Sequence, residues 1–251
     1  MAEYRAKVKA TETSFRIVEL IREHEDIAVA EIAREMGVAK SGVHKHLQTL
    51  VHLGYLYQDD NGYHLSNQFR TLCSSAAKQL PVETARQVVD DLAETTGHAS
   101  NFIAHEHDRG VYVVCRAPDR EKEFHSAGEI APLHASAGGK AILAFLSSHN
   151  REAILDQYKF TEYTPKTITE QGELEKQLQS IRDRQVAFDR QERRENHQCV
   201  ASPVLGGDGD PIGAVSVTGD ISQMSGKRLE EDVVGLVTSA AQSIRADYFS
   251  Q

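Results

Sequence analysis

Apolar residues recur every three or four positions in the first quarter of the chain, which predicts short amphipathic helices there. The first helix is predicted over residues 12–24, with Thr11 as its N-cap. The residues that mark its buried side are Phe15, Val18, Ile21 and Arg22. A short acidic break at residues 25–26 ends it.

The next two helices are separated by a glycine. Residues 29–36 carry one apolar stripe, and Gly37 stands where a left-handed residue commonly ends a helix. We expect Val38 to fill the turn that follows. The third helix, at residues 39–53, repeats the stripe and ends at Gly54. Two short helices joined by a tight turn that contains glycine predict a helix-turn-helix.

A hairpin is predicted directly after the third helix. Residues 55–58 and 63–65 are rich in aromatic residues and flank Asp59-Asp60-Asn61-Gly62, whose Asn-Gly pair favours a tight turn. A helix-turn-helix followed by a hairpin is a winged helix. We therefore assign residues 11–65 to a winged helix-turn-helix domain, preceded by a flexible arm at residues 1–10.

The rest of the chain predicts a linker and a second domain. Ser66 can cap a helix over residues 66–80 that stops at Pro81, and we interpret this helix as the linker. Residues 81–251 have a mixed pattern. Helices are predicted over 81–97, 135–147, 149–157, 170–183 and 226–248, and strands over 101–107, 111–116, 198–205 and 212–218. Strands with helices to one side or end of the sheet predict an α+β domain.

Charge separates the third helix from the rest of the chain. The net charge of −9 argues against a nucleic-acid partner, but DNA responds to charge within about 10 Å. Residues 36–58 contain no aspartate or glutamate, in a chain with 37 acidic residues. The basic residues in this stretch are Lys40, His44, Lys45, His46 and His52. The wing tip, with Asp59 and Asp60, is a poor phosphate contact.

We expect double-stranded operator DNA to meet the polar face of the third helix. Lys40 and Ser41 would lie near phosphates, and His44, Lys45 and Gln48 would point toward base edges. The alternative is an ordinary solvated helix face. For His46, packing inside the domain or against a second copy is as good an interpretation as DNA contact.

Other features exclude several classes of protein. Three separated cysteines, without a CxxC pair, predict reduced thiols in a cytoplasmic protein. The sequence contains no apolar run of about 18 residues, so we expect no membrane-spanning helix. The N-terminus does not resemble a signal peptide. The histidines lack metal-ligand spacing, so we expect neither a metal nor a cofactor.

Two motifs in the second domain resemble those of the IclR-type transcriptional regulators. Residues 128–144, GEIAPLHASAGGKAILA, are similar to the first signature of that family. CVASPV at residues 199–204 and AVSVTG at residues 214–219 are similar to the second. The resemblance extends over residues 10–248. It implies a GAF-like effector-binding domain, assembly as homodimers or dimers of dimers, and small effectors such as carboxylates, sugar acids or aromatic-degradation intermediates.

The resemblance also implies an effector pocket. Its residues would be the backbone groups of Ala137 and Gly138 and the side chains of Asp189, Cys199, Ser216 and Thr218. The last two lie two apart on a predicted strand, so both face one side, and their hydroxyls can donate to a carboxylate. We expect Cys199 to line the pocket rather than to sense redox state.

The chain departs from the family pattern near the predicted pocket. Gln191 occupies a position where the family usually has glutamate, and Arg193 and Arg194 follow it. If these arginines lie at the pocket mouth, they favour an anionic effector. In the third helix, Gly42 replaces the usual hydroxyl residue.

Two other functions stay open at this point. An enzyme on a GAF-like domain would need a nucleophile with a base and an acid, and Cys199, His197 and Asp189 are close in sequence. The resemblance assigns two of these to binding instead. A ligand-independent architectural DNA-binding protein is the other alternative. The stretch Gly138-Gly139-Lys140-Ala141 resembles part of a phosphate-binding loop, but it lacks the first part of that motif and the hydroxyl residue after the lysine. We therefore do not expect a phosphate-binding loop there.

Overall fold

The computed structural model describes residues 8–24, 27–77, 80–119, 124–224, 226 and 228–250. Contacts between residues divide the chain into two compact units, Met1–Lys78 and Gln79–Gln251. The acidic break and the first seven residues of the predicted arm lie outside the described residues. None of the described helices is long and apolar enough to cross a membrane.

The N-terminal unit is built on three helices. They are α1 (Lys9–Glu23), α2 (Val29–Met36) and α3 (Lys40–His52). Their core contains Ile17, Ile32 and Leu47, all fully buried. Gly37 takes the left-handed conformation, with φ 63°, that ends α2 and allows the turn into α3. The predicted helix-turn-helix is therefore confirmed.

Three details of the prediction are wrong. The first helix begins at Lys9, not at residue 12, after Val8 in extended conformation. Its buried side holds Ile17 and Ile21, which lie four residues apart, and Arg22 is exposed. Phe15 is 62% exposed, since two residues of an α-helix turn the side chain about 200° away from Ile17. Val38 does not fill the turn and is 39% exposed.

The wing is an antiparallel pair of short strands, β1 (Leu56–Gln58) and β2 (Tyr63–Leu65). Asp59 Oδ1 accepts the backbone N–H groups of Asn61 at 2.8 Å and Gly62 at 3.1 Å, and lies 2.9 Å from His64 Nε2. These hydrogen bonds lower the pKa of Asp59, and the one with His64 has the largest effect. The acid at the wing tip thus organises the turn itself.

The fourth helix, α4 (Gln68–Ala77), belongs to the N-terminal unit. Ser66 Oγ accepts the backbone N–H of Gln68 at 3.1 Å, in agreement with the cap predicted for it. The described helix ends at Ala77, and residues 78–79 of the predicted linker lie outside the described residues.

A six-stranded antiparallel sheet forms the middle of the C-terminal unit, in the order β5-β4-β3-β8-β7-β6. The strands are β3 (Ala99–Glu106), β4 (Arg109–Arg116), β5 (Ile130–Ala131), β6 (Ala187–Arg190), β7 (His197–Leu205) and β8 (Pro211–Asp220). The predicted strands are confirmed. The two edge strands, β5 and β6, are too short to show an alternating pattern in the sequence.

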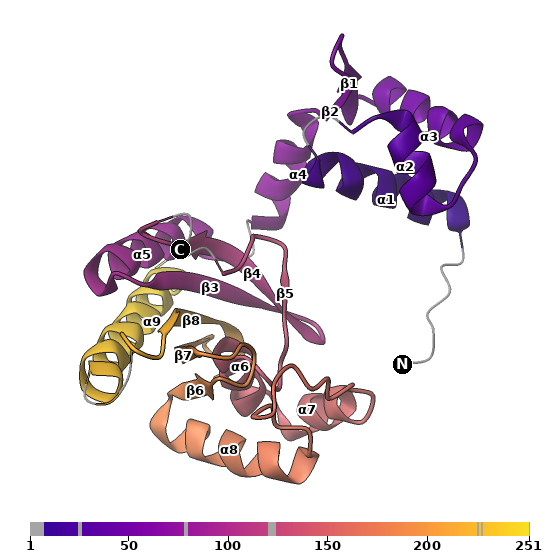
Figure 1. Cartoon of the computed structure of the whole chain (residues 1–251). Helices are drawn as coiled ribbons and strands as arrows, with labels where there is room; N and C mark the ends of the chain where they lie inside the picture. Colours follow the sequence, from indigo (N-terminus) through magenta and orange to yellow (C-terminus); the bar gives the residue numbers. More distant parts are fainter. Residues whose placement is uncertain are drawn as a thin grey trace. The chain divides into compact units, whose positions relative to one another are not determined.

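Helices cover both faces of this sheet (Figure 1). They are α5 (Val82–Thr96), α6 (Ala137–Phe145), α7 (Ser148–Leu155), α8 (Gln171–Arg184), the π-helical turn η2 (Arg228–Val233) and α9 (Val234–Tyr248). Phe102 and Val200 pack in the cluster with α5 and α9, whereas their neighbours Ile103 and Ala201 pack in the cluster with α6 and α8.

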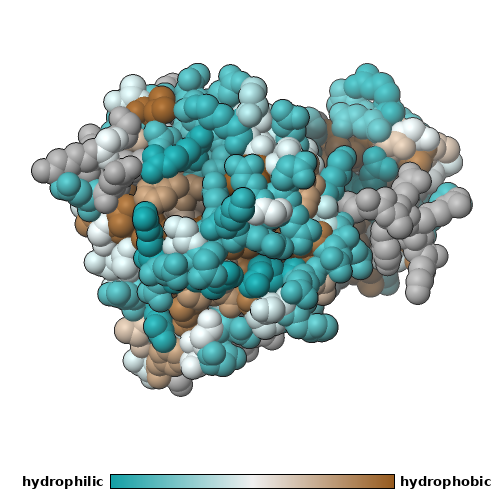
Figure 2. Space-filling model, turned by 90° about the horizontal axis from the view of Figure 1, so that it is seen from below, coloured by the Kyte–Doolittle hydropathy of each residue, from teal (hydrophilic) through white to brown (hydrophobic). Residues whose placement is uncertain are grey.

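The unit is α+β, as predicted, but the expectation of helices on one side or end is wrong. Successive residues of β3, β7 and β8 are buried, because each of the two strand faces meets its own helix layer. A central sheet between two helical layers is compatible with a GAF-like fold. The surface drawn in Figure 2 is mostly hydrophilic, with smaller hydrophobic areas between the polar residues.

Candidate DNA-binding helix and effector cavity

Helix α3 presents one apolar and one polar side. Val43 and Leu47 are fully buried in the core of the N-terminal unit. The side chains predicted to contact DNA share the exposed side; they are Lys40, Ser41, His44, Lys45 and Gln48. His46 is set apart from them, because its Nδ1 lies 2.8 Å from Ser14 Oγ on α1. The structure thus places His46 in the packing between helices.

An apolar groove of about 480 Å³ lies in the same unit. Residues of α1, α3 and α4 line it, together with Leu53 and Tyr55. Three large side chains that line it are exposed: Phe15 by 62%, Leu53 by 54% and Leu72 by 52%. This concentration of exposed apolar surface explains why the sequence pattern of α1 suggested Phe15 as a buried residue.

A cavity of about 90 Å³ lies in the C-terminal unit. Its lining residues are Tyr112, Phe124, His125, Glu129, Ser136, Asp189, Arg193, Arg194, His197, Gln198, Cys199 and Thr218. Ser136, Asp189, Cys199 and Thr218 are buried, whereas Arg194 is exposed. The buried residues therefore form the inner end and the arginine marks the mouth.

The structure brings three of the predicted pocket residues to this cavity, namely Asp189, Cys199 and Thr218. Ser216 is buried but is not one of the lining residues, and its Oγ accepts a hydrogen bond from Asn101 Nδ2 at 3.5 Å. The two arginines that the sequence left open, Arg193 and Arg194, both line the cavity.

The small residues at the start of α6 have a packing role in this structure. Ala137 and Gly138 are fully buried and do not line the cavity. A Cβ on Gly138 would lie 2.5 Å from Ile103 Cδ1, so the glycine lets the helix approach the sheet. Ser136, the N-cap, lines the cavity in their place, and its Oγ accepts the backbone N–H of Gly139 at 3.1 Å.

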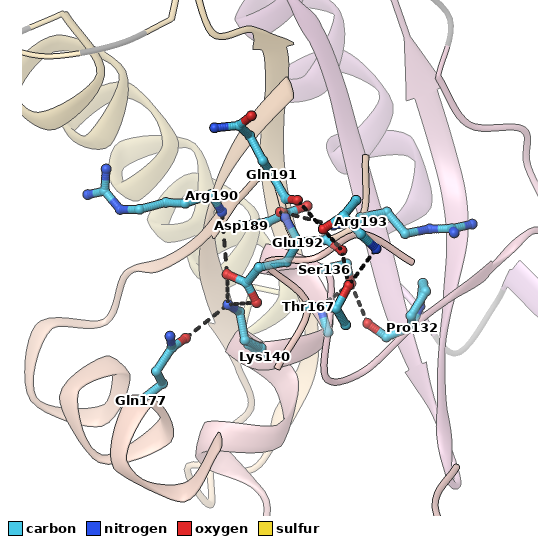
Figure 3. A network of polar contacts seen from close by, with 12 residues as sticks. Pro132, Ser136, Lys140, Thr167, Gln177, Asp189, Arg190, Gln191, Glu192 and Arg193 are labelled. Atoms are coloured by element: carbon cyan, nitrogen blue, oxygen red, sulfur yellow. Dashed lines mark hydrogen bonds and ion pairs between the residues drawn. The ribbon is translucent and has the colours of Figure 1, made fainter. Parts of the chain in front are cut away.

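A buried ion pair next to the cavity was not predicted. Lys140 is fully buried, and its Nζ lies 2.6 and 2.7 Å from the carboxylate oxygens of Glu192 and 2.9 Å from Gln177 Oε1 (Figure 3). The available signal was a lysine inside the apolar run AGGKAILA, because a buried charge requires a partner. Nothing in the sequence indicated which acid would be that partner.

Asp189 holds the turn that carries the arginines. Its Oδ1 accepts the backbone N–H groups of Glu192 at 2.6 Å and Arg193 at 3.3 Å. The turn also contains Gln191 with φ 69°. The side chain of Arg193 points away from the Lys140–Glu192 pair (Figure 3). Burial, and then the nearby Glu192 carboxylate, raise the pKa of Asp189 to about 7.

Cys199 is paired with Asp189 across β6 and β7. Burial, and then the Asp189 carboxylate, raise the pKa of the Cys199 thiol to about 12. The thiolate is the nucleophilic form of cysteine, so at neutral pH this side chain is an unreactive thiol. His197 Nδ1 lies 2.9 Å from the carbonyl oxygen of Glu195. These three residues therefore do not form the catalytic set considered from the sequence.

Aromatic side chains pack against the guanidinium groups of the two arginines at the mouth of the cavity. The guanidinium of Arg193 lies 4.2 Å from the ring centre of Tyr163, and that of Arg194 lies 5.3 Å from the ring centre of Phe124. Within the described part of the chain, two polar atoms on the lining residues are buried without a hydrogen-bond partner, Arg193 Nε and Gln198 Oε1. Buried groups of this kind are normally satisfied by a protein group, a water or a ligand.

A winged helix with an exposed basic face, combined with a unit that holds a polar cavity, defines an effector-binding transcriptional regulator. The chain belongs to the IclR family. Residues 10–60 match the IclR helix-turn-helix domain, and residues 75–246 match the C-terminal domain of the bacterial transcriptional regulator IclR. The resemblance seen in the sequence motifs is thereby confirmed.

Named relatives agree with this membership. The chain is 28% identical over 245 residues to a probable HTH-type transcriptional regulator, ArcR, of Halobacterium salinarum, covering 95% of this chain and 93% of the relative. It is 30% identical over 233 residues to the regulator BhcR of Paracoccus denitrificans, covering 91% and 83%. The fold is similar to that of an IclR homologue from Microbacterium hydrocarbonoxydans in complex with 4-hydroxybenzoate (TM-score 0.81, 18% identity, 96% of this chain and 100% of the other).

Proposed function

We propose that this IclR-type regulator binds operator DNA as a homodimer, or as a dimer of dimers, and that a small anionic effector in the cavity alters its affinity for DNA. The observation that carries the proposal is the pair of arginines, Arg193 and Arg194, at the mouth of a cavity whose lining includes unpartnered buried polar atoms. The protein acts by binding and not by catalysis, in the cytoplasm, where its thiols stay reduced.

The exposed side of α3 supplies the DNA contacts. Lys40 and Ser41 lie at its N-terminal end, where helix termini favour phosphates, and the other three residues lie one and two turns further along. Two lysines and an acid-containing wing make a weak electrostatic anchor. Base contacts and pairing of two recognition helices therefore supply much of the affinity.

We expect His44→Ala and Gln48→Ala each to lower operator affinity about tenfold, because each removes a hydrogen-bonding group that faces base edges. Fluorescence anisotropy with labelled operator DNA measures the effect. His52→Ala is the matched control, since this histidine is exposed at the far end of α3. An equal loss in the control, or no loss in either variant, would contradict the assignment.

The apolar groove of the N-terminal unit is the surface we propose for pairing with a second copy. A palindromic operator presents half-sites about 34–36 Å apart, so two copies related by a twofold axis would each read one half-site. An isologous contact buries the same surface of both copies, and the exposed apolar side chains of the groove lie together on α1, on α4 and at the residue that follows α3. One groove against its symmetry mate would cover Phe15, Leu53 and Leu72 at once.

Phe15→Glu is expected to reduce the number of copies in the assembly, because a carboxylate at the groove cannot be buried against apolar side chains. Sedimentation velocity of the full chain measures the assembled mass. Tyr57→Glu is the control, since Tyr57 is 51% exposed on the wing, outside the groove. An unchanged mass for Phe15→Glu would show that copies pair elsewhere.

The effector function is tested with a metabolite screen by thermal shift. A ligand of the folded state must raise the melting temperature, by an amount that grows with the logarithm of its concentration relative to its Kd. We expect stabilisation by organic acids, and loss of that stabilisation in Arg193→Gln. If no metabolite stabilises the chain and operator binding is unaffected, the ligand-independent architectural function is the correct one.

A further inference from the structure

Glu129 brings a negative charge to the mouth of the effector cavity. It lines the cavity together with Arg193 and Arg194. Its Oε1 lies 3.9 Å from Nη2 of Arg193, and the side chains of this pair, Glu129 and Arg193, are 33% and 32% exposed. A ligand can therefore approach the ion pair from the solvent side while the inner walls of the cavity stay in place.

The carboxylate of Glu129 is held by its own loop. Its Oε1 lies 3.2 Å from His125 Nδ1, and its Oε2 accepts the backbone N–H of Ser126 at 3.2 Å. Burial lowers the pKa of His125, so the ring is neutral at pH 7. Because a carboxylate only accepts hydrogen bonds, the ring proton is on Nδ1, and Nε2 accepts the hydroxyl of Tyr112 at 3.1 Å. Glu129 is thus positioned before any ligand binds.

The ion pair leaves the donors of the Arg193 guanidinium available. At 3.9 Å the contact is too long for a hydrogen bond, so Glu129 balances the charge of Arg193 without occupying its terminal N–H groups. Arg194 differs from Arg193. Its guanidinium lies 5.3 Å from the ring centre of Phe124, and no acid in the described part of the chain forms an ion pair with it.

The other acid of the lining, Asp189, is turned to the inner end of the cavity. It is 7% exposed, and its Oδ1 accepts the N–H groups of the turn that follows it. Burial raises its pKa to about 7, so the carboxyl is partly protonated at neutral pH. Two arginines and one exposed carboxylate therefore leave one positive charge at the mouth for the ligand to balance.

We propose that Glu129 is a specificity-determining residue of the effector site and that the effector is an organic acid with a single negative charge. Glu129 supplies one of the two negative charges that Arg193 and Arg194 balance, and the effector supplies the other. A dianion brings its second charge close to Glu129, and like charges a few Å apart repel each other. This inference rests on the effector-binding function proposed above and narrows it to one charge class.

Pairs of acids of equal size and different charge test the inference by isothermal titration calorimetry of the full chain at neutral pH. The pairs are malonamate with malonate and succinamate with succinate, in which an amide group replaces one carboxylate. We expect the unmodified chain to bind the amide of each pair about tenfold more tightly than the dianion, as one like charge nearby requires. Glu129→Gln keeps the size of the side chain and removes its charge. It should bind the dianions about tenfold more tightly than the unmodified chain does, and the preference for the amides should disappear.

Glu195→Gln is the matched control, because it removes the same charge from an exposed residue in the turn after Arg194 that does not line the cavity. Its affinity for any of the four acids should change less than about twofold, since water and salt screen an exposed charge. A gain in affinity also separates a charge effect from damage to the fold, because a damaged site binds less tightly. The double variant Glu129→Gln with Arg194→Gln again has one positive charge in excess, so it should return to preferring the amides.

The possible failures are distinguishable. Equal or tighter binding of the dianions by the unmodified chain, or the same gain in Glu195→Gln as in Glu129→Gln, would overturn the role of Glu129 and leave the effector function standing. If none of the four acids binds and an acid with two charges stabilises the chain in the thermal-shift screen, the charge class is wrong. If no acid binds by either method, the proposed function fails with it.

Discussion

Replacing Glu192 with alanine is expected to destabilise the C-terminal unit by about 3–5 kcal/mol, because it leaves the charge of Lys140 buried and unpaired. Lys140 is fully buried and Glu192 is 5% exposed, so the remaining charge of Lys140 would be shielded from bulk water. Gln177 would be the one remaining hydrogen-bond partner that the described residues offer Lys140. Differential scanning calorimetry should record a fall of roughly 10 °C in the melting temperature of this unit.

A double variant separates the cost of an unpaired charge from the loss of side-chain volume. Lys140→Met with Glu192→Leu removes both charges, and apolar replacement of a whole buried pair is often neutral. We expect it to recover most of the stability lost in Glu192→Ala. Glu195→Ala, an exposed position in the same turn, is the control and should change little. If Glu192→Ala matches that control, the ion pair contributes nothing measurable.

The second large effect concerns Asp189 and pH. The pKa of its carboxyl is about 7 in the folded chain and about 3.9 when unfolded. The folded state therefore binds the proton more tightly, and the free energy of unfolding falls as the pH rises from about 4 to about 7. The loss is about 4 kcal/mol in total and levels off above the folded-state pKa. The charged groups that face Asp189 are Lys140 and Glu192, and the neutral thiol of Cys199 lies opposite.

Asp189→Asn removes this dependence. The amide keeps an oxygen that can accept the N–H groups of Glu192 and Arg193, and it stays neutral at every pH. We expect the variant to be as stable as the unmodified chain near pH 4 and more stable at pH 8. Urea unfolding followed by circular dichroism at several pH values measures this. Asp210→Asn, at an exposed position in the β7–β8 turn, is the control, and equal pH profiles for all three proteins would refute the assignment.

The same carboxyl links effector binding to protons. An anion in a cavity of about 90 Å³ lies close to Asp189, and a like charge favours the neutral form. Binding of an acid should therefore take up a proton above pH 7. Calorimetry in buffers of different ionisation enthalpy measures that uptake, which Asp189→Asn should abolish.

The winged helix was predictable because its elements follow from local signals. Gly37 ends one helix, the Asn61-Gly62 pair turns the hairpin, and each element has its own apolar stripe. The prediction that Phe15 is buried was wrong because the spacing of apolar residues shows which side of a helix is apolar. It does not show whether the core of the same chain covers that side. An apolar side chain that lines an exposed groove has the same sequence pattern as one in the core.

The sheet and the effector cavity were predictable only in part. The long strands show their turns and alternation, but β5 and β6 are defined by pairing with distant residues. Family motifs led to Asp189, Cys199 and Thr218. The partnership of Lys140 with Glu192, and the place of Ser136 in the lining, depend on how segments far apart in sequence pack together. No local pattern contains that information.

The coupling between the cavity and DNA is the central claim. Anisotropy titrations of DNA from the region flanking the chain's own gene, with and without a saturating organic acid that stabilises the chain in the thermal-shift screen, test it directly. The account predicts that this acid changes the operator affinity by at least about fivefold, and that Arg193→Gln removes the change. An identical operator affinity in both titrations, with the acid shown by calorimetry to be bound, would contradict it.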